Sequence, residues 1–142
     1  MDLTPLAEAL AAGRLPKIKP LVSEALAAGV PAKEILENGL LAGMKVVGDK
    51  FKAGKMYVPE VMLAARCMQT AADMIKPQLQ KEEAESGKSA SGTVIIGTVK
   101  GDRHDIGKNL CRLMLEGRGL NVIDLGVDVP AEKFVAEAQK HN

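Results

Sequence analysis

The spacing of apolar residues changes once along this 142-residue chain, and that change limits the folds open to it. Up to about residue 83, apolar residues recur every three or four positions, which is typical of amphipathic helices. From residue 93, runs rich in valine and isoleucine alternate with helical patterns, which is typical of strands joined by crossover helices. The stretch between them is rich in serine, glycine and charge and has no apolar period. We therefore predict a helical domain over 1–83, a linker over 84–92 and an α/β domain over 93–142.

Proline and glycine divide the first region into helices. Thr4 and Pro5 predict a helix start, as an N-cap followed by proline at the first helical position, and Gly13 predicts its end. The expected helices cover about residues 4–12, 16–28, 31–51 and 59–83. Because their connections are short and each has an apolar stripe, we expect an antiparallel four-helix bundle.

Two glycines interrupt the third expected helix. Gly39 and Gly43 lie four residues apart, and glycine in a helix costs about 1 kcal/mol relative to alanine. We expect the compensation to be the close approach of a neighbouring helix.

The second region predicts strand, helix, strand and helix. The first strand is expected over about 93–99 and the second over 121–127. The first is apolar on both faces, as a parallel strand covered by helices is. A helix is expected over 106–116, and another begins at Pro130. The loop after the first strand therefore leaves the carboxyl end of a buried strand, where open α/β sheets bind ligands.

That loop contains a D-x-H-x-x-G pattern, in the run Asp102-Arg103-His104-Asp105-Ile106-Gly107. Three fixed residues at fixed spacing arise by chance in roughly one per cent of chains this long. A neutral imidazole at His104 is a good ligand for a transition metal such as cobalt. Asp102 can accept the hydrogen of the other ring nitrogen, and Gly107 leaves room for a bulky planar group at the helix start. The alternative is a solvated loop histidine beside charged neighbours.

Composition excludes several other functions. The net charge is +1 and the aromatic residues are only Phe51, Tyr57 and Phe134, so we expect no nucleic acid or membrane partner. Cys67 and Cys111 lie in different apolar helical patterns, which predicts two buried thiols and no disulfide. The first residues lack a signal-peptide pattern, and no long apolar run follows them. We expect a cytoplasmic protein.

Two parts of the chain resemble one family. The loop motif resembles the cobalt-ligand motif of the corrinoid proteins of anaerobic methyltransferase systems, which act on methanol, methylamines or aryl methyl ethers, and of the cobalamin-binding module of methionine synthase. Residues 46–51 and 54–61 resemble the helical cap that this family places over its cofactor. The similarity spans nearly the whole chain.

The resemblance implies a helical-bundle cap followed by a Rossmann-like, flavodoxin-type cobalamin domain. It implies cobalamin bound base-off, with His104 as lower axial ligand to cobalt, Asp102 as its hydrogen-bond partner and Gly107 as a packing position. The cofactor-binding residues it implies are Asp102, Arg103, His104, Asp105, Ile106 and Gly107 in the loop and Phe51, Val58 and Val61 in the cap. Each cap residue is equally compatible with an ordinary bundle core.

The function implied by the resemblance is that of a methyl carrier rather than of a complete enzyme. One partner, a substrate:corrinoid methyltransferase, would load the cofactor. A second, a methylcorrinoid:acceptor methyltransferase, would pass the methyl group to tetrahydrofolate or a thiol. A reductive activase is a further implied partner.

The sequence departs from the family in its second domain. The family fold has five parallel strands, whereas two are predicted here before His141 and Asn142. The later motifs that line the channel for the nucleotide tail are not in this sequence. We therefore expect a chain truncated after the second strand, with one apolar strand edge left unpaired.

Other functions remain open. A cobalamin-dependent sensor would carry an output segment, and an adenosylcobalamin isomerase subunit would carry a catalytic barrel. A flavodoxin-like or receiver-like module would bind no cobalt, and a receiver would use Asp102, Asp105 and Asp124 as an acidic cluster for magnesium. The bundle could also act as an interaction scaffold alone.

Overall fold

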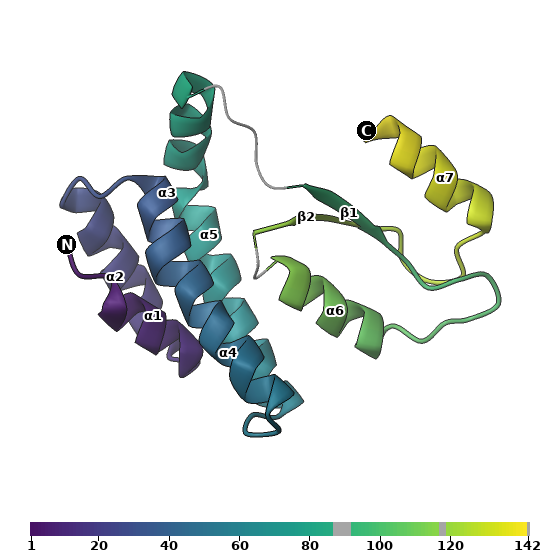
Figure 1. The fold of residues 1–142 in the computed structure, drawn as a ribbon, viewed down its shortest axis with the longest axis horizontal. Coiled ribbons are helices and arrows are strands. Elements are labelled where there is room, and N and C mark those ends of the chain that lie inside the picture. The colour runs from purple at the N-terminus through teal and green to yellow at the C-terminus, as the bar shows by residue number, and fades with distance from the viewer. Residues whose placement is uncertain (87–91, 117–118, 142) are drawn as a thin grey trace. The chain divides into compact units, whose positions relative to one another are not determined.

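The computed structural model describes residues 1–86, 92–116 and 119–141, and it divides into two compact units, Met1–Ser89 and Ala90–Asn142 (Figure 1). The first is helical and the second combines a parallel sheet with helices. This confirms the expected fold class of a helical region followed by a Rossmann-like region. Each unit is described by itself below.

The helical unit follows the predicted pattern closely. Its elements are α1 (Thr4–Ala11), α2 (Leu15–Ala27), α3 (Ala32–Glu34), η1 (Ile35–Leu41), α4 (Ala42–Lys52) and α5 (Val58–Ser86). One predicted cap is wrong, because Thr4 is already helical and Leu3 occupies the N-cap position. The carboxylate of Asp2 accepts a hydrogen bond from the Thr4 amide at 2.9 Å instead. Since α5 continues to Ser86, residues 84–86 of the expected linker are helical, and residues 87–91 lie outside the described residues.

The core of this unit is formed by aliphatic side chains from every long helix. Helix α2 packs against α5, and α1 packs against α4 (Figure 1). The largest fully buried side chains are Leu6, Leu10, Ile18, Val22, Ile35, Leu40, Met44, Val47, Val61, Cys67 and Ile75. Cys67 is thus buried as predicted, and burial raises the pKa of its thiol.

The two helical glycines lie where α1 approaches, as the sequence predicts. A Cβ added at Gly39 would lie 2.8 Å from Cδ2 of Leu6. A Cβ added at Gly43 would lie 2.8 Å from the carbonyl oxygen of Ala7, which is backbone and is costly to displace. The glycines therefore allow contact between α1 and the third helix at a separation that a side chain would prevent.

The third helix contains a π-helical segment that its apolar spacing does not reveal. Residues Ala32 to Lys52 form one continuous helical run in which η1, Ile35–Leu41, is π-helical. A π turn holds one more residue than an α turn, so it changes which side chains face the core after it. Met44 and Val47, beyond the segment, and Ile35, at its start, are all buried.

A carboxylate from α5 caps this helical run. Glu82 accepts hydrogen bonds from the amides of Ala32 at 2.7 Å and Lys33 at 3.0 Å, at the helix start, and from Gln78 at 3.1 Å. These amides have no partner inside their own helix, and a negative charge is favoured at a helix amino terminus. Glu82 therefore joins two helices that are far apart in sequence.

Replacing Glu82 with alanine is expected to lower the free energy of unfolding of the helical unit by about 1 kcal/mol, the typical cost of losing a capping side chain. Urea unfolding followed by circular dichroism measures the change. Glu85→Ala is the matched control, because Glu85 is an exposed residue of the same helix. Equal stability of the two variants would contradict the capping role.

The second unit contains β1 (Thr93–Ile96), α6 (Ile106–Glu116), β2 (Asn121–Asp124) and α7 (Ala131–Lys140). The strands are parallel, with Thr93 opposite Asn121 and Ile96 opposite Asp124. Helices α6 and α7 lie on opposite faces of the sheet (Figure 1). A Cβ at Gly97 would lie 2.9 Å from Cζ of Phe134, so α7 packs closely on the end of β1.

Three details of this unit differ from the prediction. Both strands end three residues early, because beyond Ile96 and Asp124 the pairing is reduced to a single bridge between Val99 and Val129. The strands are half-buried rather than buried, since two helices cover only part of the sheet in the described residues. Cys111 is exposed on α6, so the prediction of a buried thiol there is wrong.

Candidate functional site

The loops that leave the two strands lie side by side. The Thr98 amide donates to the Gly126 carbonyl at 2.9 Å, and the Val129 amide donates to the Thr98 carbonyl at 2.9 Å. The D-x-H-x-x-G motif therefore lies in the loop between β1 and α6, at the carboxyl ends of the strands, as predicted. This edge is where parallel α/β sheets hold ligands.

Asp102 and His104 form the polar pair at the centre of this loop. Oδ1 of Asp102 lies 2.5 Å from Nδ1 of His104 and also accepts from the His104 amide at 3.0 Å. The hydrogen bonds from the His104 amide and ring hold the pKa of Asp102 below its ordinary value. The carboxylate thus occupies Nδ1, and the side chain of His104 is 97% exposed. Nε2 is the ring nitrogen available to a ligand.

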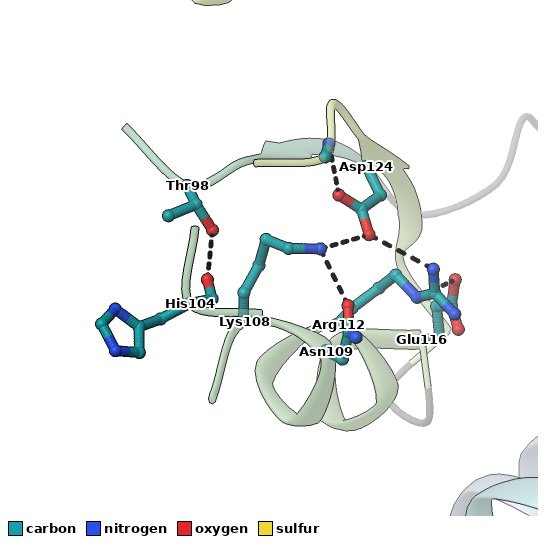
Figure 2. Close-up of polar contacts among 8 residues, drawn as sticks. Thr98, His104, Lys108, Asn109, Arg112, Glu116 and Asp124 are labelled. Carbon is teal, nitrogen blue, oxygen red and sulfur yellow. Dashed lines mark hydrogen bonds and ion pairs between the residues drawn. The ribbon is translucent and has the colours of Figure 1, made fainter. Parts of the chain in front are cut away.

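A buried threonine fixes the backbone beneath the histidine. The hydroxyl of Thr98 donates to the carbonyl oxygen of His104 at 2.7 Å, and Figure 2 shows the imidazole pointing away from α6 and β2. Sequence reasoning missed this residue. The available signal was a threonine at the end of an otherwise apolar strand, six residues before the histidine.

An ion-pair cluster joins the start of α6 to the end of β2 (Figure 2). Nζ of Lys108 lies 2.6 Å from Oδ2 of Asp124 and donates to Asn109 Oδ1 at 2.8 Å. Nη1 of Arg112 lies 3.3 Å from the same Asp124 oxygen, and the Gly126 amide donates to Oδ1 at 2.8 Å.

The central pair of this cluster, Lys108 and Asp124, is largely shielded from water. The side chains of Lys108 and Asp124 are only 9% and 18% exposed. The hydrogen bond from Lys108, with the Gly126 amide and the charges of Lys108 and Arg112, holds the pKa of Asp124 below its ordinary value against the effect of burial. Sequence reasoning did not connect these residues. The signal was a lysine in the first turn of the motif's helix and an acid at the last position of the next strand.

The same contacts weigh against a receiver-like magnesium site. Asp124 is neutralised by two cations, so it does not gather with Asp102 and Asp105 as that alternative required. Across the described ranges 1–86, 92–116 and 119–141, no group of three or more His, Cys, Asp or Glu side chains could hold an ion. In that part of the protein, a metal at this site would therefore not be held by a cluster of three or more such side chains.

The other predicted loop residues lie at the same edge. Arg103 and Asp105 are exposed, and Ile106 and Gly107 are the first residues of α6. A Cβ built at Gly107 would meet nothing within 4 Å, so the space beside the helix start is open. Since Nε2 of His104 is also free to accept a ligand, the loop fits a large planar cofactor with a metal centre.

The predicted cap residues all belong to the helical unit, near the turn between α4 and α5. Phe51 is half-buried near the end of α4, and Val58 opens α5 with 36% of its surface exposed. Val61 is fully buried in the helical core. Tyr57 and Met62 are well exposed beside Val58, so this end of the unit has an apolar surface.

In the described residues, none of the helices combines the length and apolar character needed to cross a membrane.

Comparison with known families identifies both units. A family model described as a B12 binding domain matches residues 3–76, and a second model with the same description matches residues 92–142. The first match covers more than half of the chain, and the second contains the histidine loop.

Similar proteins have corrinoid-related names. Monomethylamine corrinoid protein 1 of Methanosarcina barkeri is 46% identical over 121 residues, which are 85% of this chain and 55% of the relative. Trimethylamine corrinoid protein 1 of Methanosarcina acetivorans is 43% identical over 120 residues, with 84% and 55% covered. The chain therefore spans about half the length of these curated relatives.

Two solved structures with cobalamin- or corrinoid-related names also match this chain. The methanol:cobalamin methyltransferase complex of Methanosarcina barkeri contains a chain that matches with a TM-score of 0.82 and 34% identity, over 96% of this chain and 51% of that one. The monomethylamine corrinoid protein of the same organism matches with a TM-score of 0.60 and 41% identity, over 96% of this chain and 62% of that one.

Proposed function

This chain belongs to the family of B12-binding proteins, and from that membership we propose that it is a methyl-carrying corrinoid protein whose His104 is the lower axial ligand of a base-off cobalamin. The observation that carries the proposal is the contact between Asp102 and Nδ1 of His104. A histidine whose Nδ1 is held by a carboxylate has a defined tautomer and a more basic Nε2, which is how metal-binding histidines are oriented.

Each loop residue has a distinct task in this proposal. Asp102 holds the imidazole ring and can accept the hydrogen of its Nδ1. The hydroxyl of Thr98 holds the His104 backbone by donating to its carbonyl oxygen. Gly107 keeps the helix start free of a side chain beside the cofactor. When bound, the corrin supplies the cobalt chemistry by which a methyl group is accepted and released. The residues of the chain bind that group and set the ligand field of its metal.

The apolar surface at the start of α5 is the proposed cover for the opposite face of the cofactor. Val58 and Met62 are exposed at a spacing of four residues, so they share one side of the helix. Phe51 lies near the end of the preceding helix. An apolar cover excludes water and oxidants from a reducing metal centre, and it must move to admit each partner. Val61, which is buried, would support this surface from behind.

The proposed partners are two methyltransferases. A substrate:corrinoid methyltransferase would deliver the methyl group, and a methylcorrinoid:acceptor methyltransferase would pass it to tetrahydrofolate or a thiol, with a reductive activase restoring the cofactor. The names of the similar proteins make methylamines and methanol the first donors to test. The proposed location is the cytoplasm.

Electron paramagnetic resonance of the cobalamin-loaded protein, reduced to cobalt(II), tests the axial ligand. A nitrogen ligand splits the cobalt lines into triplets when it is ¹⁴N and into doublets when it is ¹⁵N. We expect doublets when ¹⁵N-labelled protein binds unlabelled cobalamin, because the ligand then comes from His104. Triplets would show that the benzimidazole of the cofactor is the ligand and would overturn the proposal.

The carrier role has a separate test. The loaded protein, with its cobalt reduced to cobalt(I), is mixed with methyltransferases and with methanol, monomethylamine or trimethylamine, and the visible spectrum is followed through a single turnover. One donor system is expected to methylate the cofactor stoichiometrically. If the protein binds cobalamin but none of these systems methylates it, the carrier role with these three donors is contradicted.

A further inference from the structure

Asp128, in the loop between β2 and α7, forms two hydrogen bonds with the loop that carries the histidine. Its carboxylate Oδ1 accepts from the Gly101 amide at 2.8 Å, and its own amide donates to the Asp102 carbonyl oxygen at 2.9 Å. The two bonds bracket the Gly101–Asp102 dipeptide. No role for Asp128 follows from the D-x-H-x-x-G motif, which lies 21 residues or more before it.

The backbone of Asp128 is unusual in the same place. Its φ is +55°, and among the described residues other than glycine it is the one with a positive φ. This left-handed region is disfavoured for residues with a side chain, and Asn and Asp tolerate it best. The neighbouring Val129 continues the contact, because it bridges to Val99 and donates to the Thr98 carbonyl.

These bonds connect Asp128 to the imidazole of His104 through Asp102. Asp128 fixes the backbone on both sides of Asp102, and the Asp102 carboxylate accepts from the His104 amide and contacts its Nδ1. Thr98 holds the His104 carbonyl from the other side. The ring of His104 is 97% exposed, so no packing within the described part of its unit sets its direction, and its contact with the Asp102 carboxylate is left to do so.

We propose that Asp128 is a positioning residue for the axial-ligand pair, and that it holds the Asp102 carboxylate where it can orient His104 before the cofactor arrives. Pre-organisation of this kind raises affinity because the loop does not have to be ordered on binding. The inference rests on the proposed role of His104. It adds a residue from the second strand's loop to a site otherwise assigned to the first.

Three substitutions separate the two properties of Asp128. Asp128→Asn keeps an acceptor oxygen and tolerates the left-handed backbone. Asp128→Gly keeps the backbone freedom and loses the acceptor. Asp128→Ala loses both. The amide bond to the Asp102 carbonyl is available in all three, so the series tests the side-chain contact with the asparagine variant as its matched control.

Two readouts are used, one on the cofactor-free protein and one on binding. We expect hydrogen exchange of the Gly101 amide, measured by NMR, to accelerate about tenfold in the glycine variant, the effect of losing one hydrogen bond. We expect the dissociation constant for cobalamin to rise by about the same factor. The alanine variant should bind cobalamin more weakly still. The dissociation constant of the asparagine variant should stay within about twofold of wild type.

The outcomes distinguish this inference from the proposed function. If the glycine variant binds cobalamin as tightly as wild type, the positioning role is wrong, whether or not the Gly101 amide exchanges faster. If the asparagine variant is as weak as the glycine variant, an acceptor at this position is not what matters, and the role is again wrong. If wild type binds no cobalamin while the glycine variant releases the Gly101 amide, the loop contact stands and the proposed function fails.

Discussion

Replacing Lys108 with methionine is expected to destabilise the carboxyl-terminal unit by about 3 kcal/mol, because it leaves the Asp124 carboxylate buried without its closest cation. Lys108 is the 2.6 Å partner of Asp124, and its side chain is 9% exposed. Arg112, at 3.3 Å, and the Gly126 amide remain, so the loss should fall at the lower end of the range for a broken buried pair.

Because the chain has two units, the measurement must be specific to one of them. Hydrogen exchange of the β1 and β2 amides reports the opening free energy of the sheet directly. Lys133→Met is the matched control, since Lys133 is an exposed lysine of α7 in the same unit. The double variant Lys108→Met/Asp124→Leu should recover part of the loss, because it removes the unpaired charge. If the β1 and β2 amides exchange at the same rate in Lys108→Met and Lys133→Met, the Lys108–Asp124 pair contributes little to stability.

The substitution His104→Ala is expected to weaken cobalamin binding by more than about 100-fold and to abolish the protein-derived nitrogen splitting. Loss of the partner of a ligating histidine already costs about 10–100-fold in metal affinity, and this variant loses the ligand itself. The fold should be unaffected, because the side chain is 97% exposed and the hydrogen bonds of the His104 amide and carbonyl do not need the ring. Titration with hydroxocobalamin, followed in the visible range, measures the change.

The chain offers a matched control in its other described histidine. His141 lies beyond α7 and contacts Glu137 at 3.2 Å, so His141→Ala removes an imidazole from the same unit without touching the motif loop. Its affinity should equal that of wild type. An unchanged spectrum for the His104 variant would mean that the axial nitrogen has another source, and the proposed role of this residue would then be abandoned.

The local patterns of this sequence predicted its elements well because each depends on neighbours in the chain. The stripe of α4, the run of valine and isoleucine in β1 and the stop at Gly13 follow from short-range spacing. Helix α6 begins and ends at the predicted residues, Ile106 and Glu116. The close approach at Gly39 and Gly43 was also predicted, since a glycine inside a helix needs a tertiary reason.

The features that the sequence did not reveal depend on contacts between distant segments. The cap on the third helix comes from Glu82, fifty residues after the amide it binds. The Lys108–Asp124 pair and the contact from Gly101 to Asp128 each join two loops or elements whose register is set only by the sheet. The prediction that Cys111 is buried is wrong because the apolar pattern of α6 does not say how much of this helix the two-stranded sheet covers.

Within the candidate site, the motif identified Asp102 and His104, which contact each other. It did not identify the residues that hold the backbone of this pair. Asp102 and His104 are two positions apart, and their contact follows from the chemistry of a carboxylate beside an imidazole. Thr98 and Asp128 approach from outside the motif, through a buried hydroxyl and a left-handed turn. Neither has a signature that spacing alone can recognise.

The π-helical segment limits the number of residues that the third helix can hold. Each residue of a regular helix rotates the following side chains by about 100°, and the wider turn at Ile35–Leu41 accommodates one residue more than a regular turn would. Inserting a further residue inside this stretch, which already holds its extra one, would swing Met44 and Val47 out of the interior and turn Gly43 away from α1. Insertions during evolution should therefore accumulate at the exposed turn Ala53–Lys55 and be purged from the helix before it.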